Sequence, residues 1–149
     1  MAVLIHKSAT RTSELWQGGM GDLAYPEKYD VIVLCAEELQ PEGDSERAYR
    51  PTRLICAPND DSGNEFSKEQ ATIADVAARQ ATKEYAQGRR ILVSCAQGRN
   101  RSGLVMALIL HRVFGMSGEK AIRVIRAKVP TALTNQEFVK FLLTIEGTS

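Results

Sequence analysis

The stretch RILVSCAQGRNRSGLVMALIL, residues 90–110, decides the fold, because it reads as a buried strand, a short polar loop and a buried helix in direct succession. The apolar run Arg90–Cys95 is typical of a strand buried on both faces of a parallel sheet. The run Ser102–Phe114 is apolar nearly all round, as expected of a helix in the centre of the molecule. The loop between them holds Cys95 and, six positions later, Arg101.

The same pattern extends outward along the chain. Val31–Cys35 and Arg53–Ala57 have the length and composition of further buried strands. A helix is predicted to start at Ser67, which forms a capping box with Gln70, and to end before Gly88. The residues of this helix that share an apolar face are Ile73, Val76, Ala77, Ala81 and Tyr85.

Two more helices are predicted in the C-terminal third. Ser117 is a suitable N-cap for one, and Thr134 with Glu137 forms a capping box for the other. Strands that alternate with helices indicate an α/β fold. We therefore expect residues 1–149 to form a single domain with a central, mainly parallel sheet flanked by helices and a helical C-terminal third.

Two polar segments connect these elements. Residues 38–52 are polar and contain prolines, which is typical of a surface connection. The segment APNDDSGNEF, residues 57–66, is rich in turn formers and is predicted to be a loop. Cys35 and Cys56 end apolar runs and are expected to be small core residues, with a redox role toward a reactive cysteine as the alternative.

Composition excludes several classes of protein. The chain has 19 basic and 18 acidic residues and a net charge of +1, so we do not expect it to bind long nucleic acid. The longest strongly apolar run, Leu104–Leu110, is too short to span a bilayer, and the first residues are too weakly apolar for a secretory signal. Three cysteines at irregular spacing do not suggest a disulfide framework. We expect a cytoplasmic monomer that has no membrane contact.

Metal binding is not expected either. His6 and His111 lie far apart in the sequence, and the residues around them do not have the spacing of metal ligands. The predicted chemistry therefore uses no metal and no cofactor.

The loop after Cys95 has the features of an anion site. A loop that leads into a helix can point several N–H groups inward, and the positive end of the helix dipole points to the same place. Gly98 allows the backbone to turn tightly, and Arg101 offers a planar fork that matches two phosphate oxygens. The same positive field favours the thiolate form of a cysteine. An anion site with a thiolate at its base is suited to nucleophilic attack on phosphorus.

This C-x5-R-S pattern resembles the signature loop of the cysteine-based phosphatases, and of the dual-specificity phosphatase family in particular. The resemblance implies that Cys95 is the nucleophile and forms a cysteinyl-phosphate. It implies that the loop residues Ala96, Gln97, Gly98, Arg99, Asn100 and Arg101 bind the phosphoryl group. Arg101 would also stabilise the transition state, and Ser102 would assist breakdown of the intermediate.

Other parts of the chain also resemble this family. The segment PNDDSG would supply the general acid, and the spacing from Pro58 favours Asp61, with Asp60 as the alternative. The segment TNQEF matches the N-x-x-F element of the family, so Asn135 would support the loop. The segment LWQGG near Trp16 is similar to the early strand and turn of the family. Where the family usually has histidine before the nucleophile, this chain has Ser94.

The substrate stays open at this point. The resemblance favours hydrolysis of phosphotyrosine on proteins, with phosphoserine and phosphothreonine as further candidates. GRNRSG is also similar to the loop of RNA triphosphatases, which suggests an RNA 5′-phosphatase. Phosphoinositides are a third candidate substrate, because basic loop residues such as Arg99 favour polyanionic head groups. Arg99 itself is expected either to contact the rest of the substrate or to be simply exposed. The non-enzymatic alternative is a pseudo-phosphatase that only binds phosphorylated partners.

Overall fold

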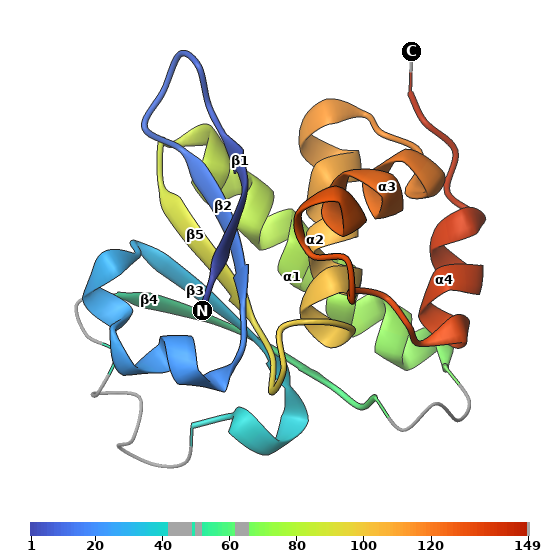
Figure 1. The fold of residues 1–149 in the computed structure, drawn as a ribbon, viewed down its shortest axis with the longest axis horizontal. Helices are drawn as coiled ribbons and strands as arrows, with labels where there is room; N and C mark the ends of the chain where they lie inside the picture. The colour runs from blue at the N-terminus through green and yellow to red at the C-terminus, as the bar shows by residue number, and fades with distance from the viewer. Residues whose placement is uncertain (42–48, 50–51, 62–65, 149) are drawn as a thin grey trace.

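A mainly parallel sheet with the strand order β1-β2-β5-β3-β4 forms the centre of the protein in the computed structural model (Figure 1). The structure describes residues 1–41, 49, 52–61 and 66–148. The strands within these residues are β1 (Val3–Lys7), β2 (Glu14–Gly18), β3 (Val31–Ala36), β4 (Arg53–Asn59) and β5 (Arg90–Ser94). Strand β1 runs antiparallel to β2, whereas β2, β5, β3 and β4 run parallel to one another. The predicted α/β class and parallel sheet are confirmed.

The helices lie where the sequence predicts them. They are α1 (Lys68–Ala86), α2 (Arg101–Phe114), α3 (Gly118–Lys128) and α4 (Gln136–Leu143). Short 3-10 helices, η1 (Met20–Ala24), η2 (Pro26–Lys28) and η3 (Glu37–Leu39), connect the strands. The predicted N-caps Ser67 and Ser117 accept bonds from the backbone N–H groups of Gln70 and Lys120, and Gly88 follows α1 with a φ of 84°.

The sheet separates two apolar clusters of unequal size. Alternate residues of the central strands, such as Val33 and Val93, pack with all the α-helices of the described chain in the larger cluster. On the opposite face, Ile32, Leu34 and Leu92 pack with Tyr29 in a smaller cluster beside the segment that contains η1 and η2. Helix α2 lies in the middle of the larger cluster, and its residues from Arg101 to Leu110 are buried. The predicted central helix is therefore confirmed.

Three details of the sequence prediction are wrong. Val76 is 41% exposed, because the buried face of α1 is centred on the alanines Ala74, Ala78 and Ala81. The other residues of the predicted face belong to the larger core cluster or pack against it: Ile73, Ala77, Ala81 and Tyr85. Cys56 is exposed, because β4 is the edge strand and its outer face is thinly covered. The N-cap of α4 is Asn135 and not Thr134, since the Asn135 side chain accepts bonds from the first helical N–H groups.

The predicted connections are described only in part. Of residues 38–52, the positions 42–48 and 50–51 lie outside the described residues, and η3 occupies the start of this segment. Of residues 57–66, the positions 62–65 lie outside them, and β4 extends to Asn59, beyond the predicted end at Ala57.

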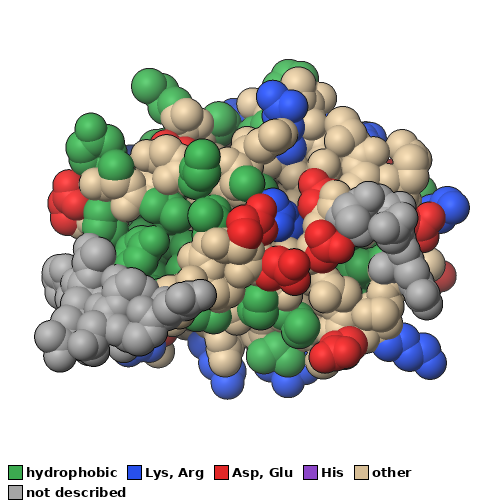
Figure 2. All heavy atoms as spheres, turned by 90° about the horizontal axis from the view of Figure 1, so that it is seen from below, with side chains coloured by type: hydrophobic (Ala, Val, Ile, Leu, Met, Phe, Trp, Pro, Cys, Tyr) green, Lys and Arg blue, Asp and Glu red, His purple; other side chains and the backbone are tan. Residues whose placement is uncertain are grey.

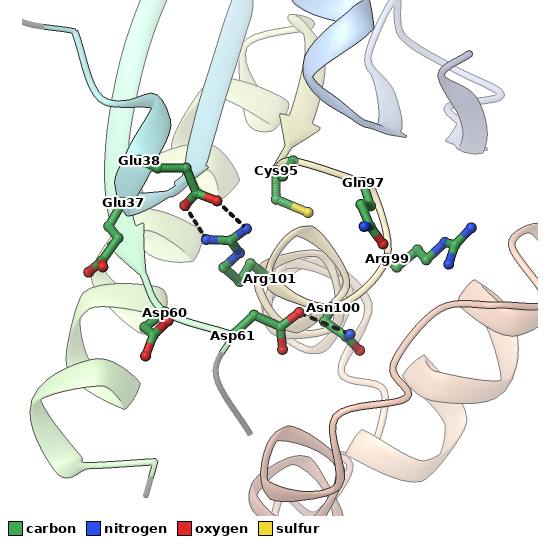
Figure 3. A pocket seen from close by; sticks show the side chains of 10 residues that line it. Glu37, Glu38, Asp60, Asp61, Cys95, Gln97, Arg99, Asn100 and Arg101 are labelled. Atoms are coloured by element: carbon green, nitrogen blue, oxygen red, sulfur yellow. Dashed lines mark hydrogen bonds and ion pairs between the residues drawn. The ribbon is translucent and has the colours of Figure 1, made fainter. Parts of the chain in front are cut away.

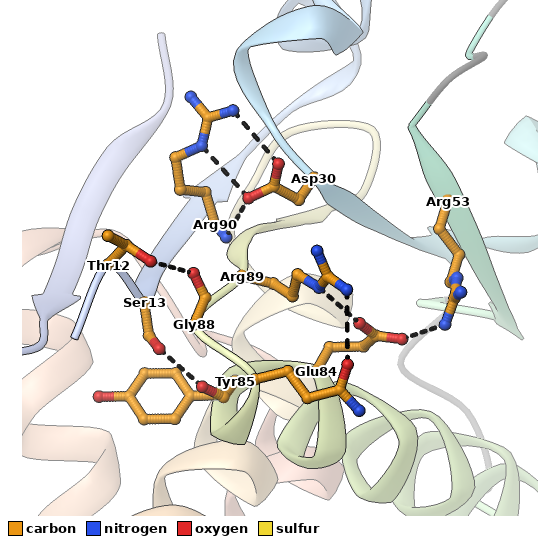
Figure 4. Close-up of polar contacts among 10 residues, drawn as sticks. Thr12, Ser13, Asp30, Arg53, Glu84, Tyr85, Gly88, Arg89 and Arg90 are labelled. Atoms are coloured by element: carbon orange, nitrogen blue, oxygen red, sulfur yellow. Dashed lines mark hydrogen bonds and ion pairs between the residues drawn. The ribbon is translucent and has the colours of Figure 1, made fainter.

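An ion pair fixes the end of the sheet that is remote from the cysteine loop. The Asp30 carboxylate accepts a bond from the backbone N–H of Arg90 at 2.8 Å and bonds from its Nε and Nη2 at 3.3 Å each (Figure 4). At the same end, Glu84 pairs with Arg53 and Arg89. These contacts hold the starting ends of β3, β4 and β5 to one another and to the end of α1.

We predict that Asp30→Asn lowers the free energy of unfolding near neutral pH by about 1 kcal/mol, the value typical of a partly exposed ion pair. The hydrogen bonds from Arg90 hold the pKa of Asp30 below its usual value. Because this pKa is lower in the folded than in the unfolded state, the Asp30 carboxylate stabilises the fold at pH values above its unfolded-state pKa of roughly 3.9. This stabilisation is lost as the pH falls through the folded-state pKa. Urea unfolding at neutral pH and at the lowest pH at which the protein stays folded measures the difference. The exposed Glu27→Gln is the control, and a difference between Asp30→Asn and wild type that persists at the lower pH would contradict the prediction.

Candidate active site

The loop between β5 and α2 lies at the carboxyl end of the parallel strands, and it carries Cys95 at its start and Arg101 at its end (Figure 3). Gly98 has a φ of 73°, a conformation that favours glycine. A Cβ at this position would lie 2.7 Å from the backbone carbon of Gly18. Glycine is therefore required both for the turn of the loop and for its close contact with the end of β2.

Hydrogen bonds hold the carbonyl groups of the loop outward. The Ala96 oxygen accepts a bond from the backbone N–H of Met20 at 3.1 Å, and the Gly98 oxygen accepts one from Gln17 Nε2 at 3.0 Å. The Arg99 oxygen accepts a bond from the backbone N–H of Leu133 at 3.2 Å. Because the N–H of a peptide points opposite to its carbonyl, the N–H groups that follow these carbonyls face away from the supporting residues. This arrangement forms a nest for an anion.

Leu133 holds its position at a conformational cost. Its φ is 59°, although it is buried and is not glycine. Strain of this kind persists only where the surrounding structure enforces it, and it clusters at functional sites. The Leu133 side chain packs against Gly103, where a Cβ would lie 3.0 Å from Leu133 Cγ. The backbone N–H that supports the Arg99 carbonyl thus belongs to a residue that the surrounding structure holds in a strained conformation.

Cys95 lies at the base of the loop and is 2% exposed. Its Sγ is within hydrogen-bonding distance, 3.3 Å, of Ser102 Oγ in the first turn of α2. Its backbone N–H donates to the Gly18 oxygen at 3.2 Å. Ser94, which stands where the resembled family usually has histidine, donates from Oγ to the Gly19 oxygen at 3.1 Å. The hydroxyl of Ser94 therefore ties the loop to the turn after β2.

Arg101 is buried beside Cys95 and is paired with a residue that the sequence analysis did not identify. Its Nη2 donates to Glu38 Oε2 at 2.8 Å, and its Nη1 bonds to Glu38 Oε1 and to the Asn59 oxygen. The hydrogen bonds between these two side chains raise the pKa of Arg101 and lower the pKa of Glu38. Arg101 Nε is buried without a hydrogen-bond partner in the described part of the chain. A buried N–H group in such a position can still donate a hydrogen bond to a bound anion.

The two candidate acids lie at the same rim but have different contacts. The carboxylate of Asp61 accepts bonds from Asn135 Nδ2 at 2.6 Å and from Asn100 Nδ2 at 3.0 Å. The side chain of Asp60 is exposed, and its backbone N–H donates to Gln70 Oε1 at 3.2 Å. Gln70 thus supports the acidic segment instead of completing the predicted capping box. In Figure 3, Asp61 lies beside Asn100, whereas Asp60 lies on the side of Glu37.

Asn135 connects three parts of the site. Its Oδ1 caps α4 by accepting bonds from the N–H groups of Glu137 and Phe138, while its Nδ2 holds Asp61. Its backbone N–H also donates to Asn100 Oδ1 at 2.9 Å. The contacts of Asn135 therefore join the helical C-terminal third to the cysteine loop and to the acidic segment.

These residues line a pocket of about 420 Å³. The lining residues are Glu37, Glu38, Asp60, Asp61, Cys95, Ala96, Gln97, Arg99, Asn100 and Arg101. Figure 2 shows acidic side chains gathered on this face of the molecule. Arg99 is exposed, and its side chain extends away from Cys95 (Figure 3). The pocket thus combines a positive base with a largely acidic rim.

Cys35 lies next to the pocket but inside the core. Leu34 and Ser94 are paired in neighbouring parallel strands, and the next residue of each strand, Cys35 and Cys95, belongs to the same core cluster. Burial raises the pKa of Cys35 well above its usual value, and the charge of Cys95 adds to this effect. Cys35 is therefore a protonated core thiol, as expected from the sequence.

Four residues that support the site were not predicted to do so from the sequence: Gln17, Glu38 and Leu133, and also Gln70, which was assigned only to the cap of its helix. Two of them left a signal in the sequence. Gln17 is a polar residue in a short strand next to Leu15 and Trp16, and Glu38 lies two residues after the carboxyl end of a parallel strand, where ligand sites of α/β folds lie. Gln70 and Leu133 act through local geometry that residue types alone do not reveal.

Sequence comparison does not identify relatives of this chain: no protein-family model matches it, and no curated protein is similar to it in sequence. Comparison of structures does find similar proteins. Human DUSP28 superposes with a TM-score of 0.76 at 20% identity, covering 96% of this chain and 90% of that one. Tk-PTP in its active form gives a TM-score of 0.72 at 23% identity and covers 96% of both chains.

A third similar structure is PTPMT1 in complex with PI(5)P, with a TM-score of 0.68 at 17% identity, covering 93% of this chain and 92% of that one. The similarity extends over more than nine tenths of this chain in each case. The chain therefore has the fold of the dual-specificity and tyrosine phosphatases.

Proposed function

We propose that this protein is a cysteine-dependent phosphatase that hydrolyses phosphomonoesters through a cysteinyl-phosphate intermediate. The observation that carries the proposal is the position of Cys95 at the base of a loop whose carbonyl groups are held outward, beside a buried Arg101 with an unpaired Nε in the described residues. The phosphatase fold supports it. A phosphoryl group on this loop would accept bonds from the loop N–H groups and from Arg101.

In the first step, the Cys95 thiolate attacks phosphorus and forms the S–P bond. The P–O bond to the leaving group breaks, its electron pair stays on the leaving oxygen, and that oxygen takes a proton from a carboxylic acid. Arg101 and the loop N–H groups stabilise the charge on the phosphoryl oxygens, and the N-terminus of α2 adds to this effect.

In the second step, water attacks phosphorus and loses a proton to the same carboxylate. The S–P bond breaks, and its electron pair returns to sulfur as the thiolate. Ser102 Oγ, 3.3 Å from the sulfur, donates a hydrogen bond to the thiolate as it leaves. This assigns Cys95 as nucleophile and Ser102 as the residue that assists breakdown of the intermediate.

We assign Asp61 as the general acid. The amides of Asn100 and Asn135 hold its carboxyl group beside the loop. Each oxygen accepts one of these bonds and keeps a second position, where the proton for the leaving group can sit. The side chain of Asp60 is exposed at the outer rim, so its contribution is to the charge of the rim. Asn135 is a positioning residue in this scheme.

We further propose that the substrate is a phosphorylated protein and that phosphotyrosine is the preferred phosphorylated residue. The pocket is lined by four carboxylates, Glu37, Glu38, Asp60 and Asp61, and by two arginines, Arg99 and Arg101. Such a rim repels polyanions, and both an RNA 5′-triphosphate and a phosphoinositide head group carry several negative charges. PTPMT1, which was solved with PI(5)P, makes the lipid the second candidate. The proposal places the protein in a reducing cytoplasm as a monomer, where Cys95 stays reduced.

A panel of substrates tests this function. The wild-type protein should hydrolyse a phosphotyrosine peptide with a higher kcat/KM than a phosphoinositide or a 5′-triphosphorylated RNA. Cys95→Ser should lose turnover by at least about 10³-fold, because the hydroxyl is a poor nucleophile at neutral pH. The same variant should still bind tungstate, since the loop and Arg101 remain.

Three results would change the proposal. A highest kcat/KM on the lipid or on the RNA would replace the substrate but not the mechanism. Binding of the phosphopeptide without turnover by the wild-type protein would indicate a pseudo-phosphatase. Near wild-type turnover by Cys95→Ser would show that Cys95 is not the nucleophile.

The general acid is tested with two leaving groups. Asp61→Asn should lower kcat on a tyrosyl phosphate by about 10²-fold, because a poor leaving group needs a proton. On an aryl phosphate with a very acidic phenol, the loss should stay below about threefold, since such a group leaves without one. Asp60→Asn is the matched control and should change neither rate by more than about threefold. If Asp60→Asn shows the selective loss and Asp61→Asn does not, the assignment is wrong.

A further inference from the structure

We propose that Gln17, in β2, is a positioning residue of the phosphate loop: its side-chain amide fixes the peptide between Gly98 and Arg99 so that the N–H of Arg99 faces the phosphoryl group. The inference rests on the proposed phosphatase function. Neither the signature of the loop nor the fold assigns a role to Gln17, which lies 78 positions before Cys95 in the sequence.

Gln17 occupies a buried position in the sheet, where an apolar residue is expected. Gln17 is 1% exposed and lies on the same face of β2 as Leu15, which belongs to the larger core cluster. Its Nε2 donates to the Gly98 oxygen at 3.0 Å, while its Oε1 is buried without a partner among the described residues. Burial of a half-satisfied amide is unfavourable for folding. A polar group that is retained at such a site indicates a functional constraint.

Gln17 contacts the peptide between Gly98 and Arg99, which is the peptide of the loop with the least restricted backbone. Gly98 has a φ of 73°, and glycine restricts its own backbone least. A hollow of about 440 Å³, lined in part by Gln17, Gly98 and Arg99, lies beside this part of the loop. Rotation of this peptide would turn the Gly98 carbonyl toward the phosphoryl group, where it would repel the anion.

The neighbouring carbonyls of the loop have a different kind of support. The Ala96 oxygen is held by the backbone N–H of Met20, and the Arg99 oxygen by that of Leu133. Gln17 holds the Gly98 oxygen with a side chain, so a substitution can remove this one bond and leave the others in place.

The test compares Gln17→Met with the wild-type protein and with a matched control. Methionine has the same length and no donor, so it should fill the same space and leave the Gly98 carbonyl unsupported. The control is Ser13→Ala, which removes another buried side-chain bond to a carbonyl, from Ser13 Oγ to Tyr85 at 2.6 Å, at the far end of the same strand (Figure 4). Gln17→Leu is a second variant in case methionine packs poorly.

For each protein, kcat on an aryl phosphate, the dissociation constant for tungstate and the midpoint of thermal unfolding are measured. For Gln17→Met, kcat should fall by about fivefold and tungstate should bind about fivefold more weakly, the effect of one neutral hydrogen bond. The unfolding midpoint should change little, because the removal of a half-satisfied buried amide offsets the loss of the bond to the Gly98 oxygen. For Ser13→Ala, the midpoint should fall and both other values should stay within about 1.5-fold of the wild type.

A loss of activity without a matching loss of stability separates positioning from a structural role. If kcat and tungstate affinity of Gln17→Met equal those of the wild type, or if they fall only together with the unfolding midpoint, the inference is wrong while the phosphatase proposal stands. If the wild-type protein neither hydrolyses the phosphate ester nor binds tungstate, the phosphatase proposal is wrong and this inference with it.

Discussion

The contact between the cysteine loop and the end of β2 is the constraint on which the site depends. Gly98 approaches the backbone of Gly18 so closely that a Cβ on Gly98 would lie 2.7 Å from it. The bonds from Cys95 N to Gly18 O and from Met20 N to Ala96 O follow from the same approach. Because β2 pairs with β5 in parallel register up to Gly18 and Ser94, the sheet delivers both segments to the same level. The nest is thus a consequence of sheet register.

The charged and polar residues of the site come from segments that are far apart in the sequence. Glu38 follows β3, Asp61 follows β4, Arg101 begins α2, and Asn135 caps α4. Each lies at the end of an element, where side chains can point into the same pocket without disturbing the core. Arg101 meets a strong partner in Glu38 and keeps its Nε free of partners in the described chain. The site is therefore already formed before substrate binds. A bound phosphoryl group would compete with Glu38 for Arg101 or accept a bond from the unpaired Nε.

The sequence predicted the parts of this arrangement that local patterns encode. Strand, loop and helix around Cys95 follow each other directly, so apolar runs and Gly98 were sufficient to predict them. Long-range pairing was not predictable in the same way, because the bond between Glu38 and Arg101 joins residues 63 positions apart. Gln17 was missed since a single polar residue in a short strand does not indicate which face it occupies. The cap of α4 was misplaced by one residue because Thr134 and Asn135 are both good N-caps, and the Thr134 hydroxyl instead accepts a bond from Asn100.

The central claim is that Cys95 carries the phosphoryl group during turnover. The direct measurement is to mix the wild-type protein with an aryl phosphate, denature it rapidly with detergent at mildly alkaline pH during steady-state turnover, where the S–P bond is stable, and analyse its peptides by mass spectrometry. The account predicts a phosphoryl adduct on the peptide that contains Cys95, and no adduct on the peptides that contain Cys35 or Cys56. Steady release of phosphate without an adduct on Cys95, or with the adduct on another residue, would contradict it.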